Sequence, residues 1–181
     1  MIHHWVGTIA LPGATLAEAL ELVQDYDRYA EIYDFHVQRF ERLSADDGRF
    51  AVYLRVFMKK IVTVVLDTEY DVVFEAIGDR RAFVASYATR IVEVDTADTP
   101  EERTLPAGRD HGLLWRLNMY CSFDERGDQA LMQCEWIGLS RSIPWLLRWV
   151  VTPLVTSVPR DLLMRTLEAA RDHLAMSGAD G

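Results

Sequence analysis

The stretch IVTVVLDTEYDVVFEAI, Ile61 to Ile77, alternates between apolar and polar side chains over most of its length. Residues spaced by two point to the same side of a β-strand. The acidic side holds Asp67, Glu69 and Asp71, and the other side holds Val62, Val64, Leu66, Thr68, Tyr70, Val72 and Phe74. The pattern predicts a strand of an antiparallel sheet with one face in solvent and one face in the core.

Further strands are predicted on both sides of this stretch, and most of them are joined by hairpins. Turn residues such as Ala45-Asp46-Asp47-Gly48 and Gly78-Asp79 separate the apolar runs. The strands are expected at Trp5–Leu11, His36–Leu43, Arg49–Met58, Arg81–Val94, Gly112–Phe123 and Gln129–Leu139. The polar segment Asp95–Asp110 is expected to be a surface loop.

Two short helices are predicted after the first strand, and one long helix is predicted after the last. Thr15 with Glu18 three residues later is a capping box, which marks the start of a short helix. The predicted helices are Thr15–Asp25, Asp25–Tyr33 with its tyrosines on one side, and Pro159–Met176 with an apolar face. An antiparallel sheet with its helices mainly on one side satisfies this order, so we expect one α+β domain spanning residues 1–181.

The composition excludes several classes of function. The chain has 28 acidic and 19 basic side chains, a net charge of −9, and no basic patch, so we expect no nucleic-acid binding. Its two cysteines form no CxxC pair, and no HExxH, GxSxG or glycine-rich phosphate motif is present. We therefore expect no metal and no cofactor. The N-terminal residues do not have the pattern of a signal peptide, so cytoplasmic residence is the default expectation. An exported protein whose leader had been removed would have the same N-terminal sequence, so export stays an alternative.

A family resemblance adds to this interpretation. The segment LVQDYDRYAEIYDFHVQRFERL, Leu22 to Leu43, is similar to the two short helices and following strand of coenzyme Q-binding proteins and polyketide cyclases. The segment from Tyr120 to Val150 resembles uncharacterised bacterial members of the same SRPBCC or START-like superfamily. The resemblance implies a helix-grip fold: a curved antiparallel sheet of six to seven strands around a long C-terminal helix, with a hydrophobic cavity between them. It implies no single activity, since the fold hosts carriers, sensors and cyclases.

The last predicted hairpin gives a definite register. If Gly127-Asp128 is a two-residue type II′ loop, Phe123 faces Met132 and Cys121 faces Cys134. One face then carries Leu113, Trp115, Leu117, Met119, Cys121, Phe123, Met132, Cys134 and Trp136. This wall either packs as core against the last helix or lines part of a cavity. We expect the cysteines to be two buried thiols in preference to a disulfide, because a directly opposed strand pair distorts disulfide geometry.

Candidate ligand-binding residues follow from this wall and from the neighbouring strands. Tyrosine hydroxyls on an apolar wall would orient a ligand carbonyl or phenol. The predicted cavity lining is Tyr70, Phe74, Phe83, Tyr87, Trp115, Met119, Met132, Trp136, Leu163 and Leu167. No catalytic residue is assigned.

Two kinds of ionisable residue leave alternatives open. An inward guanidinium of Arg55, Arg90 or Arg116 would meet a carboxylate head group, but solvated positions on the convex face are favoured. His36 is either a general base near the cavity mouth or, as favoured, a structural or surface histidine. His3 and His4 are adjacent, so a strand would send them to opposite faces and away from a shared metal site.

The apolar segment IPWLLRWVVTPLVTSVPRDLL, Ile143 to Leu163, is too short and too interrupted to span a membrane, because Arg148 and Pro153 lie inside it. We expect a short amphipathic helix that ends at Pro153. Trp145 and Trp149 are candidates for a cavity gate or a shallow membrane-docking patch, and the alternative is that both rings pack against the sheet edge.

The sequence therefore favours a protein that binds or transports a small apolar ligand, such as a lipid, quinone, sterol-like or polyketide-like molecule. Alternatives are an aromatase or cyclase acting on a polyketide-like substrate, and a protein-interaction module. Catalysis is not supported by any motif. The one partner that we expect besides the ligand is a membrane surface, which the protein would contact peripherally if Trp145 and Trp149 form a docking patch.

Overall fold

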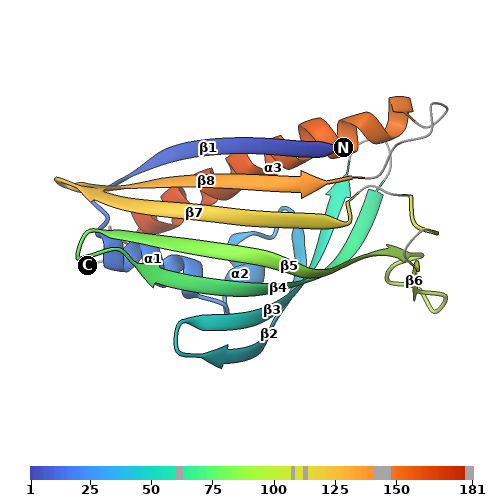
Figure 1. Cartoon of the computed structure of the whole chain (residues 1–181), viewed down its shortest axis with the longest axis horizontal. Helices are drawn as coiled ribbons and strands as arrows, with labels where there is room; N and C mark the ends of the chain where they lie inside the picture. Colours follow the sequence, from blue (N-terminus) through green and yellow to red (C-terminus); the bar gives the residue numbers. More distant parts are fainter. Residues whose placement is uncertain (60–62, 107–108, 112–113, 141–147, 178–181) are drawn as a thin grey trace.

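The computed structural model describes residues 1–59, 63–106, 109–111, 114–140 and 148–177, and of residues 148–156 it describes the backbone alone. Within these ranges eight strands form one antiparallel sheet with the order β1-β8-β7-β5-β4-β3-β2, and β6 pairs with β5 (Figure 1). The strands are β1 (Ile2–Pro12), β2 (Val37–Asp46), β3 (Arg49–Lys59), β4 (Thr63–Ala76), β5 (Arg81–Asp95), β6 (Arg103–Thr104), β7 (Arg116–Arg126) and β8 (Gln129–Leu139).

Tight turns set the register of the sheet. Asp46 pairs with Arg49 around Asp47 and Gly48, both of which have positive φ, so this hairpin has a two-residue loop. Arg126 pairs with Gln129, and Gly127 has φ +66°, as the predicted type II′ loop requires. The predicted register of the last hairpin is confirmed. The first strand then pairs with the last, with Ile2 opposite Leu139.

Three helices lie on one side of the sheet in the described part of the chain: α1 (Leu16–Gln24), α2 (Tyr29–Ile32) and α3 (Arg148–Ser177). Figure 1 looks onto the other side, with the helices behind the strands. The capping box of Thr15 and Glu18 is present at the start of α1. α3 crosses β1 closely at Gly7, where an added Cβ would lie 2.7 Å from Cδ1 of Leu167. The small residue therefore lets the helix approach the strand.

Some predicted boundaries were wrong. The predicted end of a helix at Pro153 does not occur, because α3 runs without a break through Pro153 and Pro159. A proline removes one backbone hydrogen bond, which the rest of a 30-residue helix tolerates. The predicted loop Asp95–Asp110 contains β6, and the predicted helix Asp25–Tyr33 is reduced to the single turn α2.

The core lies between the inner face of the sheet and the helices. The predicted apolar face of β4 is confirmed in the described residues, since Val64, Leu66, Thr68, Tyr70 and Val72 are all buried. Val62 lies outside the described residues. α3 contributes the buried residues Leu163, Leu167 and Ala170 from one face. The sheet and its last helix therefore enclose an apolar interior.

Candidate functional site

A partly open cavity of about 100 Å³ lies between the inner face of the sheet, the α1–α2 region and α3. Its lining has no charged side chain among the described residues. It consists of Val23, Tyr26, Tyr29, Tyr33, Phe40, Val52, Leu54, Tyr70, Val72, Phe74, Val84, Ser86, Met119, Cys121, Phe123, Met132, Cys134, Trp136 and Thr166. The cavity is therefore apolar and aromatic, with a few neutral polar groups.

The sheet side of the cavity follows from strand pairing. Phe74 pairs with Val84 and Val72 pairs with Ser86, so these residues of β4 and β5 share the inner face. Val84 in turn pairs with Cys121 of β7, which continues the same face toward β8. The even-numbered residues of β5 between Ala82 and Ser86 thus point inward.

Aromatic rings from the α1–α2 region cover the opposite side. The ring centroids of Tyr26 and Phe40 lie 5.1 Å apart, and those of Tyr29 and Phe40 lie 4.7 Å apart. Tyr29 and Tyr33 are 4.6 Å apart. These separations are typical of favourable aromatic pairs, so the rings stabilise one another.

Burial keeps the tyrosines of the cavity neutral. It raises the pKa of Tyr29 to about 12, and it raises the pKa values of Tyr26, Tyr33 and Tyr70 well above the usual range. The Tyr26 hydroxyl and the Thr166 Oγ1 are buried, and neither has a hydrogen-bond partner among the described residues. Buried polar groups usually have a partner, so these two hydroxyls are the strongest sign of an occupant.

His36 lies beside the cavity but not in its lining. Its ring centroid is 4.5 Å from that of Phe35, and its buried Nδ1 has no partner among the described residues. Burial, together with the positive charge of Arg165, lowers the pKa of His36 to about 4. His36 is therefore neutral at neutral pH. Its ring is buried with an unpartnered Nδ1 among the described residues, which matches neither the surface position nor the hydrogen-bonded structural role that was favoured, and it does not line the cavity as a base acting there would.

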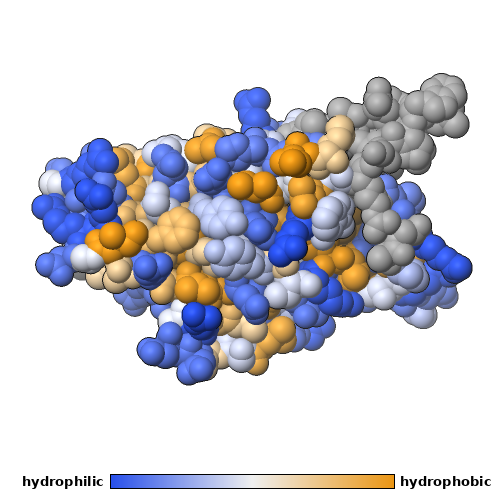
Figure 2. Space-filling model, viewed as in Figure 1, coloured by the Kyte–Doolittle hydropathy of each residue, from blue (hydrophilic) through white to orange (hydrophobic). Residues whose placement is uncertain are grey.

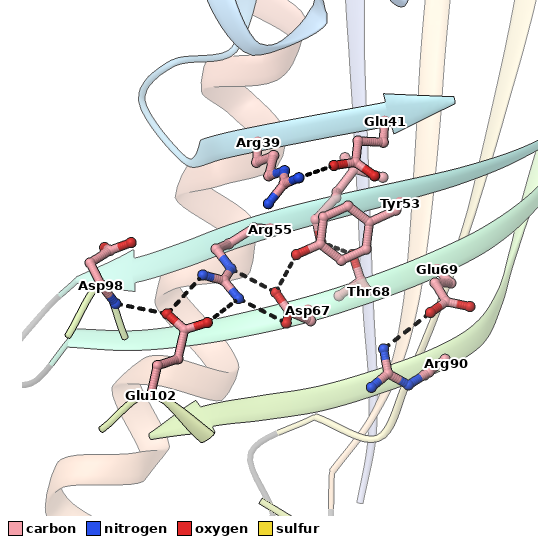
Figure 3. A network of polar contacts seen from close by, with 11 residues as sticks. Arg39, Glu41, Tyr53, Arg55, Asp67, Thr68, Glu69, Arg90, Asp98 and Glu102 are labelled. Carbon is pink, nitrogen blue, oxygen red and sulfur yellow. Dashed lines mark hydrogen bonds and ion pairs between the residues drawn. The ribbon is translucent and has the colours of Figure 1, made fainter. Parts of the chain in front are cut away.

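The cations that were candidates for a carboxylate head group lie on the outer face. Arg55 donates to both carboxylate oxygens of Asp67 at 2.8 and 3.0 Å and also to Glu102 at 2.9 and 3.0 Å (Figure 3). The Tyr53 hydroxyl donates to Asp67 at 2.6 Å. Burial raises the pKa of Asp67, but the hydrogen bonds from Arg55 and Tyr53 outweigh it and hold the pKa below its ordinary value.

A second ion pair extends this outer charge arrangement. Arg90 on β5 donates to Glu69 on β4 at 3.0 Å, and both side chains are exposed to a large extent (Figure 3). Arg116 at the start of β7 is also exposed. Hydrophilic side chains alternate with apolar ones over this face of the sheet (Figure 2). Arg55 and Arg90 thus lie on the outer face as favoured, but Arg55 is only 14% exposed and is held by two carboxylates, so it does not have the solvated position that was expected.

The structure divides the ten predicted cavity residues into three groups. Those in the lining are Tyr70, Phe74, Met119, Met132 and Trp136. Leu163 and Leu167 are fully buried on α3 but pack toward Gly7 of β1 and not into the cavity.

Phe83, Tyr87 and Trp115 were wrongly placed on the inner face. Phe83 and Tyr87 contact Tyr120 on the outer face, with ring centroids 6.2 and 5.8 Å apart. The reason is the pairing of Val84 with Cys121, which turns the odd positions of this part of β5 outward. Trp115 precedes β7 and is 48% exposed. Of the gate candidates, Trp145 lies outside the described residues, and Trp149 is described only by its backbone in α3.

The two cysteines are a second correction. Cys121 pairs directly with Cys134 as predicted, but the two are joined in a disulfide, with their Cα atoms 4.1 Å apart. The close approach of two neighbouring strands brings both sulfur atoms over the inner face. The wall of the cavity is therefore covalently fixed between β7 and β8.

The tyrosines of the α1–α2 region were missed as cavity residues. Tyr26, Tyr29 and Tyr33 recur at spacings of three and four, which already indicated one shared side of a helical segment. Nothing in the sequence indicated that this side faces Phe40 and Phe74 across the interior.

A larger cleft of about 630 Å³ lies between α1 and the end of α3. Its lining includes Glu18, Glu21, Asp25, Arg28 and His173. We favour the smaller cavity as the site, because five ionisable side chains line the larger cleft whereas the described lining of the smaller cavity carries no charge. Among the described residues, no three His, Cys, Asp or Glu side chains gather in a way that would hold a metal ion.

Comparison with known proteins rests on structure. No family model matches the chain, and no curated protein matches its sequence. The Zhui aromatase/cyclase from Streptomyces sp. R1128 is similar over 97% of this chain and 94% of its own, with a TM-score of 0.70 and 11% identity. A STAR-related lipid transfer protein from Xanthomonas axonopodis has a TM-score of 0.62 and 20% identity over 95% of this chain and 85% of its own.

A START superfamily protein from Mycobacterium smegmatis is also similar, with a TM-score of 0.59 and 14% identity over 96% of this chain and 98% of its own. The chain has the same helix-grip fold as these proteins. This confirms the predicted curved antiparallel sheet with a long C-terminal helix and short helices after the first strand. At these identities the likeness establishes the helix-grip fold alone. Among the described residues, no helix is long and apolar enough to cross a membrane.

Proposed function

We propose that this helix-grip protein binds a small apolar ligand in the cavity between the sheet and α3, as a carrier or sensor. The observation that carries the proposal is an uncharged aromatic lining that contains two buried hydroxyls without partners. Apolar walls with a few placed polar groups are typical of small-molecule sites. The likeness to a lipid transfer protein of the same fold supports the same class of ligand.

The volume limits which ligands fit without movement. A cavity of about 100 Å³ is smaller than the roughly 300–1,000 Å³ of pockets for drug-sized ligands. A sterol-like, quinone or polyketide-like molecule would therefore require the α1–α2 region and the sheet to separate. Met119 and Met132 in the lining are unbranched and adapt easily to such a change.

A matched pair of substitutions tests the proposal. Ser86 lines the cavity on β5, and Ser122 is exposed on the outer face of β7. Ser86→Leu should fill the cavity, whereas Ser122→Leu adds the same side chain outside it. The protein is purified without detergent, extracted with organic solvent and analysed by mass spectrometry.

We expect a bound apolar compound in the wild type and in Ser122→Leu, and its loss from Ser86→Leu. An empty wild type, or a compound that is retained in full by Ser86→Leu, would contradict the proposal. A protein-interaction module with no ligand would give the first of these results.

An aromatase or cyclase is a second candidate, favoured by the TM-score of 0.70 to an aromatase/cyclase and by the neutral phenols in the lining. A linear poly-β-ketone substrate mimic would be incubated with the protein, and cyclised products would be followed by liquid chromatography. Tyr70→Phe should abolish the products, and Tyr87→Phe on the outer face should not. Products formed equally by both variants, or by no protein at all, would exclude this candidate.

The membrane-docking hypothesis rests on the sequence of the segment that holds Trp145 and Trp149. Binding to anionic liposomes, measured by co-sedimentation, should fall in a Trp145→Ala/Trp149→Ala double variant. Equal binding by both proteins would exclude docking through these residues.

The cellular compartment is a further proposal. The Cys121–Cys134 disulfide favours the exported alternative over the cytoplasmic default, because disulfides persist in oxidising compartments. Alkylation of thiols during lysis of the native cells, followed by mass spectrometry, should find both cysteines unmodified. Alkylated cysteines would favour the cytoplasm.

A further inference from the structure

We infer that the cavity selects a neutral, single-ring compound that carries an oxygen atom, which forms hydrogen bonds to Tyr26 and Thr166. This inference rests on the proposed function and narrows its ligand class. It is argued from the charge, the hydroxyl groups and the size of the cavity.

The charge of the cavity excludes an ionised ligand. No described lining residue carries a charge, and the guanidinium groups of Arg55 and Arg90 are held by carboxylates on the other face of the sheet. A buried ion without a partner is strongly disfavoured. A carboxylate head group, as in a fatty acid, would find no counter-ion among the described lining residues, and Arg42, whose charge acts on the Tyr26 phenol, lies outside that lining.

The hydroxyl groups provide the recognition. Tyr26 is 7% exposed and lies in the turn between α1 and α2, and its hydroxyl has no partner in the part of the chain that the structure describes. Thr166 lines the same cavity from α3, and its Oγ1 is likewise buried without a partner in the described ranges. The Tyr26 phenol is protonated at neutral pH even at its ordinary pKa, and burial raises that pKa further, so the phenol is able to donate a hydrogen bond. A ligand oxygen would satisfy groups that are otherwise unfavourable to bury.

The size of the cavity limits how many rings the ligand can have. An engineered cavity of roughly 150 Å³ in another protein binds benzene. The present cavity of about 100 Å³ is somewhat smaller, so one ring is the largest rigid unit that fits with only small side-chain movements. The flat rings of Tyr29, Phe40 and Trp136 in the lining offer stacking surfaces to an aromatic ligand.

The experiment titrates phenol, toluene and benzoate into the full chain labelled with ¹³C at the methionine methyl groups. Met119 and Met132 line the cavity, so their methyl signals report binding at this site. Phenol and toluene differ by a hydroxyl in place of a methyl group. We expect both to shift these two signals, and benzoate to shift neither.

The variants Tyr26→Phe and Thr166→Val remove one hydroxyl each at nearly constant shape. Each should weaken phenol binding about three- to tenfold, the range for one hydrogen bond, and leave toluene binding unchanged or stronger. Tyr87→Phe on the outer face is the matched control and should change neither affinity.

Equal effects of Tyr26→Phe on phenol and toluene affinity would overturn the inference on hydrogen bonding. Benzoate binding as tight as phenol binding would overturn the inference on charge. If no single-ring compound shifts Met119 or Met132 but the wild type still yields a larger extracted compound, the inference fails while the proposed function stands. If no compound binds and none is extracted, both fail.

Discussion

The two faces of the same strands differ sharply in polarity. On β4, Tyr70 and Val72 point into an uncharged aromatic cavity, while Asp67 and Glu69 on the outer face bind Arg55 and Arg90. The charged groups on the outer face thus form ion pairs with one another, and water reaches the more exposed of them. The inner face is left without any charge in its described lining, which makes it selective for neutral ligands.

The inner face should carry most of the stability. Leu167 is fully buried where α3 crosses β1, so Leu167→Ala should lower the free energy of unfolding by about 2–5 kcal/mol through lost burial and a new cavity. Met164 on the exposed side of the same helix provides the control, and Met164→Ala should cost under about 1 kcal/mol. Urea unfolding measures both. Similar losses of unfolding free energy in the two variants would contradict the prediction that the inner face carries most of the stability.

The disulfide on the inner face should raise the free energy of unfolding further. Cys121 and Cys134 are 13 residues apart in sequence, so cross-linking should contribute about 2–4 kcal/mol, mainly by restricting the unfolded chain. Dithiothreitol should lower the urea midpoint of the wild type. It should not affect a Cys121→Ala/Cys134→Ala variant, which serves as the control, and an unchanged wild-type midpoint on confirmed reduction would contradict this role.

The outer ion pair at Asp67 should contribute less to the free energy of unfolding. Asp67→Asn should cost about 2 kcal/mol, because the side chains of Asp67 and Arg55 are only 10% and 14% exposed and Arg55 retains Glu102. Glu69→Gln removes the more exposed pair with Arg90 and should cost about 0–1 kcal/mol.

The pH dependence of this pair has a definite sign. Hydrogen bonds from Arg55 and Tyr53 overcome burial and lower the native pKa of Asp67, so its stabilisation is complete above the unfolded pKa of about 3.9 and is lost as the pH falls through the native pKa. The difference in unfolding free energy between the wild type and Asp67→Asn should therefore shrink below about pH 4. A difference that stays constant down to pH 2 would contradict the pairing.

His36 should give an effect of similar size in another pH window. Burial lowers its native pKa to about 4, below the unfolded value of about 6.5. Between these values the unfolded chain binds the extra proton, so stability should fall by about 1–3 kcal/mol as the pH drops from 6.5 to 4. His36→Gln should flatten this part of the profile, and His173→Gln on α3 should not. A slope that persists in His36→Gln would assign it to other groups.

Several local features could be predicted from the sequence, and each depends on short-range patterns. The alternation of β4 placed Tyr70 and Asp67 on opposite faces, and the Gly127-Asp128 loop predicted the pairing of Cys121 with Cys134. In contrast, the aromatic pattern of β5 suggested the wrong face for Phe83 and Tyr87. The pattern in one strand does not say which of its faces is inner, because that depends on the register with its neighbours.

The α+β class, the capping box at Thr15 and most strand positions follow from the sequence, since propensity, capping and period act over a few residues. The folded structure was needed to show that Tyr26 and Thr166, far apart in the chain, line one cavity with hydroxyls that have no partner among the described residues, and that the two cysteines are joined. Such contacts depend on how the sheet curves and where α3 crosses it, and these are properties of the packing as a whole.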